Sequence, residues 1–169
     1  MNNIIEAIVM GILTGIISGF FTSVVVTKFY RKKDESIEKS RYISSLAEYV
    51  YKLRKIMFFS GGTIPDECIN RIHQFTEDNK RPEKYKWIKF SNLEEDEVKK
   101  TIEICDFIKD KTFECHMKNS WLISDNYPED EKVSLENNIS ELKMDIFLKG
   151  TELSAQENIL RQQNKKYIS

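Results

Sequence analysis

Basic and aromatic residues alternate in one short segment, "KRPEKYKWIKF" (residues 80–90). Lysine side chains bind phosphate and aromatic rings stack on bases, so this mixture is typical of nucleotide or single-strand binding. The candidate ligand-binding residues are Lys84, Tyr85, Lys86, Trp87 and Lys89. The same composition fits two other interpretations. One is a connector that packs its aromatic rings into a helical bundle and leaves its lysines in water. The other is a contact with a membrane surface.

Catalytic chemistry has no comparable signal. The close pair Gly61 and Gly62 lacks the downstream lysine and serine or threonine of a phosphate-binding loop. A cysteine nucleophile needs a base beside it, and Cys115 and His116 are sequence neighbours that point about 100° apart on a helix. We therefore predict no catalytic residues and a non-enzymatic protein.

Metal binding is not predicted either. Cys68, His73, Cys115 and His116 would supply the two thiolates and two imidazoles of a tetrahedral zinc site, but their spacing matches no familiar zinc finger. The acidic run 94–97 is explained by a helix start, where carboxylates meet the positive end of the helix dipole. We expect neither a metal nor a cofactor. The formal net charge of −1 gives no overall electrostatic reason to expect nucleic acid as a partner.

The segments that position these residues have helical periodicity. Apolar residues recur at three-four spacing in residues 43–57, without proline or glycine between Gly19 and Ser60. This predicts an amphipathic helix that ends in "SGGTIP" (residues 60–65). The row consists of Ile43, Leu46, Val50, Leu53 and Met57, with Tyr42, Tyr49 and Ile56 beside it.

Further helices are predicted along the chain. The first is "PDECINRIHQF" (65–75), with Pro65 in its first turn and Ile69, Ile72 and Phe75 facing inward. Ser91 and Glu94 have capping-box spacing at the start of the next, 91–113. Its predicted buried row is Val98, Ile102, Cys105 and Ile108.

The last helical region comes after the connector "SDNYPED" (residues 124–130). Leu135, Ile139, Leu142 and Ile146 step by three and four, and Gly150 is expected to stop that helix. Ser154 and Glu157 then cap a short final helix that contains Ile159 and Leu160. Only residues 84–90 alternate as a strand could, so we predict an all-α bundle.

A long apolar segment precedes the bundle. Residues 7–27 contain no charge, and about 21 helical residues rise ~31 Å, the thickness of the hydrocarbon layer of a bilayer. A cleaved signal peptide would have basic residues before its apolar stretch, whereas here they come after it, at Lys28, Arg31, Lys32 and Lys33. This asymmetry predicts a retained single-pass anchor in the cell (inner) membrane, with the N-terminus outside and the C-terminal domain cytoplasmic. A buried core helix is the alternative.

Three glycines lie four residues apart within this segment: Gly11, Gly15 and Gly19. They share one face of a helix, where small residues allow two membrane helices to approach closely. We expect a helix–helix contact here, and a homo-oligomer or a different membrane protein as the partner. The alternative is that these glycines reflect only how common glycine is in membrane helices.

Together these expectations describe an all-α protein whose single transmembrane helix continues into a cytoplasmic helical bundle. Residues 1–33 are the anchor with its basic juxtamembrane segment, and residues 34–169 are the cytoplasmic domain. This layout resembles, in architecture, small bacterial membrane effectors of phage-defence systems. It implies a non-enzymatic effector that self-associates and senses a ligand such as a nucleotide. The alternative is a constitutive membrane scaffold or accessory subunit that docks a partner protein complex.

Overall fold

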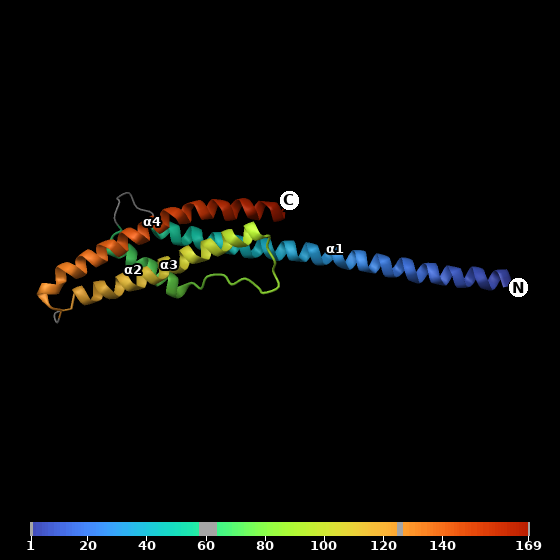
Figure 1. Cartoon of the computed structure of the whole chain (residues 1–169), viewed down its shortest axis with the longest axis horizontal. Coiled ribbons are helices and arrows are strands. Elements are labelled where there is room, and N and C mark those ends of the chain that lie inside the picture. Colours follow the sequence, from blue (N-terminus) through green and yellow to red (C-terminus); the bar gives the residue numbers. More distant parts are fainter. Residues whose placement is uncertain (1, 58–63, 125–126, 169) are drawn as a thin grey trace. The chain divides into compact units, whose positions relative to one another are not determined.

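The protein is all-α, as predicted. The computed structural model describes residues 2–57, 64–124 and 127–168, and these contain four helices and no strand. The helices are α1 (Asn2–Met57), α2 (Asp66–Asp78), α3 (Asn92–Leu122) and α4 (Glu129–Ile168), coloured along the chain in Figure 1. The chain divides into two compact units, Met1–Glu38 and Lys39–Ser169. We call the second unit the helical domain.

The first unit consists of the N-terminal part of α1. From Met10 to Tyr30 nearly every side chain is exposed, including the large apolar ones. Within the described residues, α1 contains the one segment that is long and apolar enough to cross a membrane. The prediction that this helix continues without a break through the charged residues after Thr27 is confirmed, because α1 extends to Met57. Its predicted end at residues 60–65 falls mainly outside the described residues.

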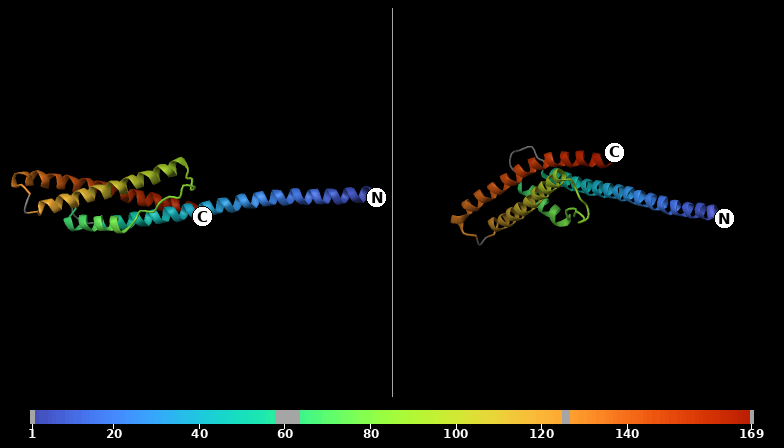
Figure 2. Two further views of the ribbon diagram at one scale, coloured as in Figure 1. Left: turned by 90° about the horizontal axis from the view of Figure 1, so that it is seen from below. Right: turned by 45° about the vertical axis from the view of Figure 1, so that its right-hand side comes forward.

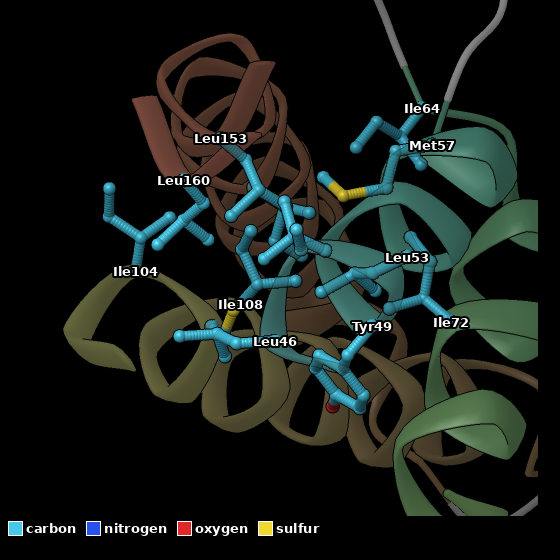
Figure 3. Close-up of a cluster of buried hydrophobic side chains, with 14 of the residues drawn as sticks. Leu46, Tyr49, Leu53, Met57, Ile64, Ile72, Ile104, Ile108, Leu153 and Leu160 are labelled. Carbon is cyan, nitrogen blue, oxygen red and sulfur yellow. The ribbon is translucent and has the colours of Figure 1, made fainter. Parts of the chain in front are cut away.

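The C-terminal part of α1 belongs to the core of the helical domain. All five residues of its predicted apolar row are buried, and so are Tyr42 and Tyr49, whereas Ile56 is half-buried. Figure 3 shows Leu46, Leu53 and Met57 directed toward Leu153, Leu160 and Ile108 of the other helices. The amphipathic periodicity therefore identified the correct face.

Helices α3 and α4 form an antiparallel pair, as both views in Figure 2 show. The Thr101 hydroxyl donates to the Gln156 side-chain oxygen at 3.1 Å within this pair. The predicted row on α3 is buried at Val98, Cys105 and Ile108 and half-buried at Ile102. Helix α3 ends at Leu122, nine residues beyond the predicted segment.

Helix α2 packs against α3. Its Ile69 and Ile72 are buried as predicted, and the ring of the half-buried Phe75 lies 5.2 Å from that of Tyr49 on α1, centroid to centroid. Pro65 is the N-cap rather than a first-turn residue, with extended backbone angles of φ −63° and ψ 152°. Because proline has no amide hydrogen to leave unsatisfied, it is well suited to this helix start.

The predicted helix stop at Gly150 is wrong. Helix α4 continues through Gly150 to Ile168, and no described glycine has a positive φ, the conformation that a glycine stop requires. The predicted cap at Ser154 therefore does not exist. Gly150 instead provides space, because a Cβ built on it would lie 2.6 Å from Met57 Cε. The apolar row also continues past it through Leu153 and Leu160, which keeps the helix packed.

Candidate functional site

The basic–aromatic segment lies in the connector between α2 and α3, drawn in yellow-green in Figures 1 and 2. Ile88 attaches it to the helical domain, because this side chain is buried in the core. The Ile88 amide donates to the Tyr85 carbonyl at 3.0 Å and closes a turn over residues 85–88. The turn leaves Tyr85 and Trp87 outside the core while Ile88 enters it.

The two outward rings are stacked on each other. Tyr85 is 61 % exposed and Trp87 is 54 % exposed. Their ring centroids lie 6.0 Å apart with an angle of 12° between the planes. Phe90 alone of the three aromatic residues is half-buried, and its ring centroid is 6.1 Å from that of Tyr42. The interpretation that this connector packs its aromatic rings into the bundle is therefore wrong for Tyr85 and Trp87.

Of the three candidate ligand-binding lysines, one is paired and two are not. Lys84 forms an ion pair with Glu95, and its Nζ lies 5.5 Å from the Phe90 ring centroid. Lys86 and Lys89 are exposed and make no ion pair within the described residues. The structure thus gathers two exposed rings and two exposed cations on one short turn, while Lys84 holds that turn against α3. Binding of a ligand by the five residues stays a prediction.

We expect the stability of the domain to separate Trp87 from Ile88. Trp87→Ala should change the free energy of unfolding by no more than about 0.5 kcal/mol, because the ring is largely exposed. Ile88→Ala should cost about 2–5 kcal/mol, because it empties a buried site. Urea titrations of both variants, followed by circular dichroism, measure the difference. Equal losses of stability would contradict the arrangement of the turn.

A surface hollow of about 380 Å³ is lined in part by the first residues of the segment but not by its exposed rings. Its lining combines the cations Lys80, Arg81 and Lys109 with acidic residues, among them Asp106. The Arg81 guanidinium is 3.3 Å from the Asp106 carboxylate. This mixed charge gives the hollow no strong preference for an anionic ligand.

Two of the three cysteines, Cys105 and Cys115, are in buried environments that disfavour reaction. Burial raises the pKa of the Cys105 thiol to about 12 and that of the Cys115 thiol to about 11. Both thiols are therefore protonated at neutral pH, whereas the thiolate is the nucleophile. The His116 ring is engaged elsewhere, with its Nδ1 2.9 Å from the Asn70 side-chain oxygen.

The two histidines meet in a way that the sequence did not indicate. The rings of His73 on α2 and His116 on α3 are stacked, with centroids 4.6 Å apart and 24° between the planes. No group of three or more histidine, cysteine, aspartate or glutamate side chains within the described residues is arranged to hold a metal ion. The pair therefore contributes to the packing of α2 against α3.

Two residues of the acidic run, Glu94 and Glu95, have the structural role that the sequence predicted. The Glu94 carboxylate accepts hydrogen bonds from the Ser91 amide at 3.1 Å and the Ser91 hydroxyl at 2.8 Å, as part of a capping box. Burial raises the pKa of Glu94, but the hydrogen bonds from Ser91, together with one from Tyr167 and the charge of Lys166, outweigh it, so the pKa lies below its ordinary value. Glu94 and Glu95 occupy the first turn of α3, where the helix dipole favours carboxylates.

The glycine face of α1 is open. A Cβ built on Gly11, Gly15 or Gly19 would meet no atom within 4 Å. The hydroxyls on the same face are already satisfied within the helix: Ser18 donates to the Gly15 carbonyl at 3.1 Å and Thr22 to the Ser18 carbonyl at 2.8 Å. Close approach of a second helix would therefore leave these hydroxyls paired. A helix–helix contact through the glycines stays a prediction.

A charge cluster around the buried Glu157 was missed in the sequence analysis. The Glu157 carboxylate accepts from Arg54 Nε and from Arg161 Nε, both at 2.8 Å. The four-residue spacing of Glu157 and Arg161 on one helix is a sequence signal for that pair. Arg54 is 103 positions away in α1, and no local pattern connects it to Glu157.

Comparison with known proteins adds no assignment: no protein-family model matches the chain, and no curated protein or solved structure gives a significant match.

Proposed function

We propose that this chain is a single-pass membrane protein whose helical domain lies in the cytoplasm and acts as a non-enzymatic effector. One observation supports it above all: α1 contains both an exposed apolar segment and a row of core residues of the helical domain. A bilayer would cover the exposed segment. The basic residues between positions 28 and 33 favour a cytoplasmic location for the helical domain.

Exposure of the apolar segment argues against a core helix. A soluble core helix would bury its large apolar side chains, whereas none of the span is buried here. Contiguous apolar surface of this size is unfavourable in water and marks an interaction with a membrane or a protein. Length and composition favour the membrane.

The continuity of α1 gives the domain a means of acting on the anchor. Residues 42–57 of α1 pack among α2, α3 and α4, so a rearrangement of the bundle has to involve the helix that contains the span. A ligand that prefers one packing of the bundle would shift the population toward it. In this proposal the glycine face lets the spans associate, and the bundle controls that association.

Self-association should depend on Gly15, the middle glycine of the face. Gly15→Leu adds a bulky side chain where a second helix would approach, so it should reduce the oligomer while leaving insertion intact. Cross-linking in membranes and mass measurement in mild detergent detect the change.

The matched control for this variant is Ile16→Leu, because Ile16 lies about a quarter turn away and keeps its bulk. This control should behave as the unmodified chain does. An oligomer of unchanged size in Gly15→Leu would show that the glycines are incidental, and would assign any association to the helical domain.

A constitutive scaffold or accessory subunit is the second candidate. An exposed apolar row on α3 favours it: Phe113, Met117 and Trp121 are exposed at four-residue spacing and so share a face. A partner protein could cover such a row.

Mass measurement of the purified chain in detergent separates the two candidates. An effector should change its oligomer when a candidate ligand, such as a cyclic nucleotide, is added. A scaffold should keep one mass with every ligand and instead co-purify with a partner.

A further inference from the structure

We propose that the turn formed by Tyr85, Lys86, Trp87 and Lys89 binds the anionic phospholipid headgroups of the membrane that α1 spans. The inference rests on the proposed membrane anchor and goes beyond it, because it assigns a second membrane contact to the helical domain. We call these four residues the lipid-facing turn.

The rings of the turn suit a membrane interface. Tyr85 and Trp87 stack in parallel and are both more than half exposed, so the pair presents an amphipathic surface. Aromatic side chains of this kind prefer the headgroup level of a bilayer, where the apolar ring body and the polar O–H or N–H are both accommodated. The burial of Ile88 fixes the backbone beneath them, so docking would order few additional groups.

The charge of the turn complements an anionic surface. Residues 82–90 contain three lysines and one acidic residue, Glu83. Lys84 is neutralised by Glu95, which leaves Lys86 and Lys89 to face outward beside the rings. Basic side chains near a membrane are attracted by the anionic lipids of its cytoplasmic leaflet.

The length of chain between the anchor and this turn allows the turn to reach the membrane surface. Phe90 contacts α1: its ring centroid lies 5.8 Å from Lys39 Nζ and 6.1 Å from the Tyr42 ring centroid. Lys39 comes twelve helical residues after Thr27, the last residue of the uncharged segment, a rise of ~18 Å. Trp87 precedes Phe90 by three residues, which span at most about 10 Å. These lengths of chain allow Trp87 to reach the headgroup layer.

A nucleotide fits the same turn less well. The two rings stack on each other, so a base cannot lie between them, and only their outer faces remain for stacking. The neighbouring hollow is lined by other residues of mixed charge. An exposed pair of rings with flanking lysines matches a lipid headgroup layer more closely than it matches an enclosed ligand.

The full-length chain in lipid nanodiscs provides the test. Trp121→Phe leaves Trp87 as the only tryptophan. In discs that contain an anionic phospholipid, Trp87 emission should shift to shorter wavelength and be quenched by phospholipids brominated near the headgroup. The wavelength shift and the quenching should both weaken in discs of phosphatidylcholine alone and at high salt. They should also weaken in the double variant Lys86→Gln/Lys89→Gln.

The reciprocal variant Trp87→Phe is the matched control. It leaves Trp121 near the far end of α3, about 45 Å of helix from Ser91, and its emission should not respond to the brominated lipid. Circular dichroism checks that each variant remains folded.

Each outcome is decisive. Trp87 emission that is identical in anionic and neutral discs, and unaffected by brominated lipid, would overturn the lipid-facing turn while leaving the anchor intact. Emission that responds only to added nucleotide would overturn it in favour of base stacking. Failure of the chain to enter discs at all would overturn both the turn and the proposed anchor.

Discussion

Leu53→Ala is expected to lower the free energy of unfolding of the helical domain by about 2–5 kcal/mol, because it empties a fully buried site. Leu53 is 0 % exposed and lies among the core side chains in Figure 3. A urea titration in mild detergent, followed by circular dichroism, measures the loss. The prediction tests whether the C-terminal part of α1 is a structural element of the domain.

Leu13→Ala is the matched control on the same helix. Leu13 is 48 % exposed and belongs to the first unit, so its truncation should leave the stability of the domain unchanged. Comparable losses for the two variants would contradict the division of α1 into a span and a core segment.

Glu157→Ala should be the most damaging substitution of a charged residue in the domain. It removes the carboxylate that both Arg54 and Arg161 contact at 2.8 Å. Breaking a fully buried ion pair costs about 3–5 kcal/mol. The side chains of Arg54 and Arg161 are 30 % and 52 % exposed, so water compensates part of the loss and we expect roughly 2–3 kcal/mol. A urea titration followed by circular dichroism measures this loss of unfolding free energy.

The same cluster should make the domain sensitive to acid. Burial raises the pKa of Glu157, but the hydrogen bonds from Arg161 and Arg54 outweigh it, so the folded-state pKa lies below the ordinary value. Its contribution to stability is therefore complete above the unfolded-state pKa of about 4.3 and is lost as the pH falls through the folded-state pKa. Glu157→Gln should be less stable at neutral pH but lose less stability below about pH 4. If the free energy of unfolding varied with pH in the same way for Glu157→Gln and for the unmodified chain, this role of Glu157 would be contradicted.

Local periodicity was sufficient for the helices and most of the core. The rows in α1 and α3 depend on residues three and four apart, and that spacing alone decides which side of a helix is apolar. Ile43, Leu46 and Val98 are accordingly buried where the pattern predicted. The capping box at Ser91 is equally local and was predicted for the same reason.

Features that depend on distant residues could not be predicted this way. Gly150 resembles a helix stop when only its neighbours are considered, and its actual role depends on Met57, far away in the sequence. The pairing of Lys84 with Glu95 and of Arg54 with Glu157 likewise requires the assembled bundle. The outward rings of Tyr85 and Trp87 result from the turn at Ile88, which alternating polarity does not encode.

The orientation of the chain in the membrane is the most direct test of the proposed function. A fluorescent reporter that folds only in the cytoplasm, fused after Ser169, should fluoresce in intact cells. Reversing the four basic residues after the span, Lys28, Arg31, Lys32 and Lys33, to glutamate should weaken that signal, because basic residues favour the cytoplasmic side. A C-terminus outside the cytoplasm in the unmodified protein would contradict the cytoplasmic effector, and a soluble, unanchored protein would contradict the membrane span itself.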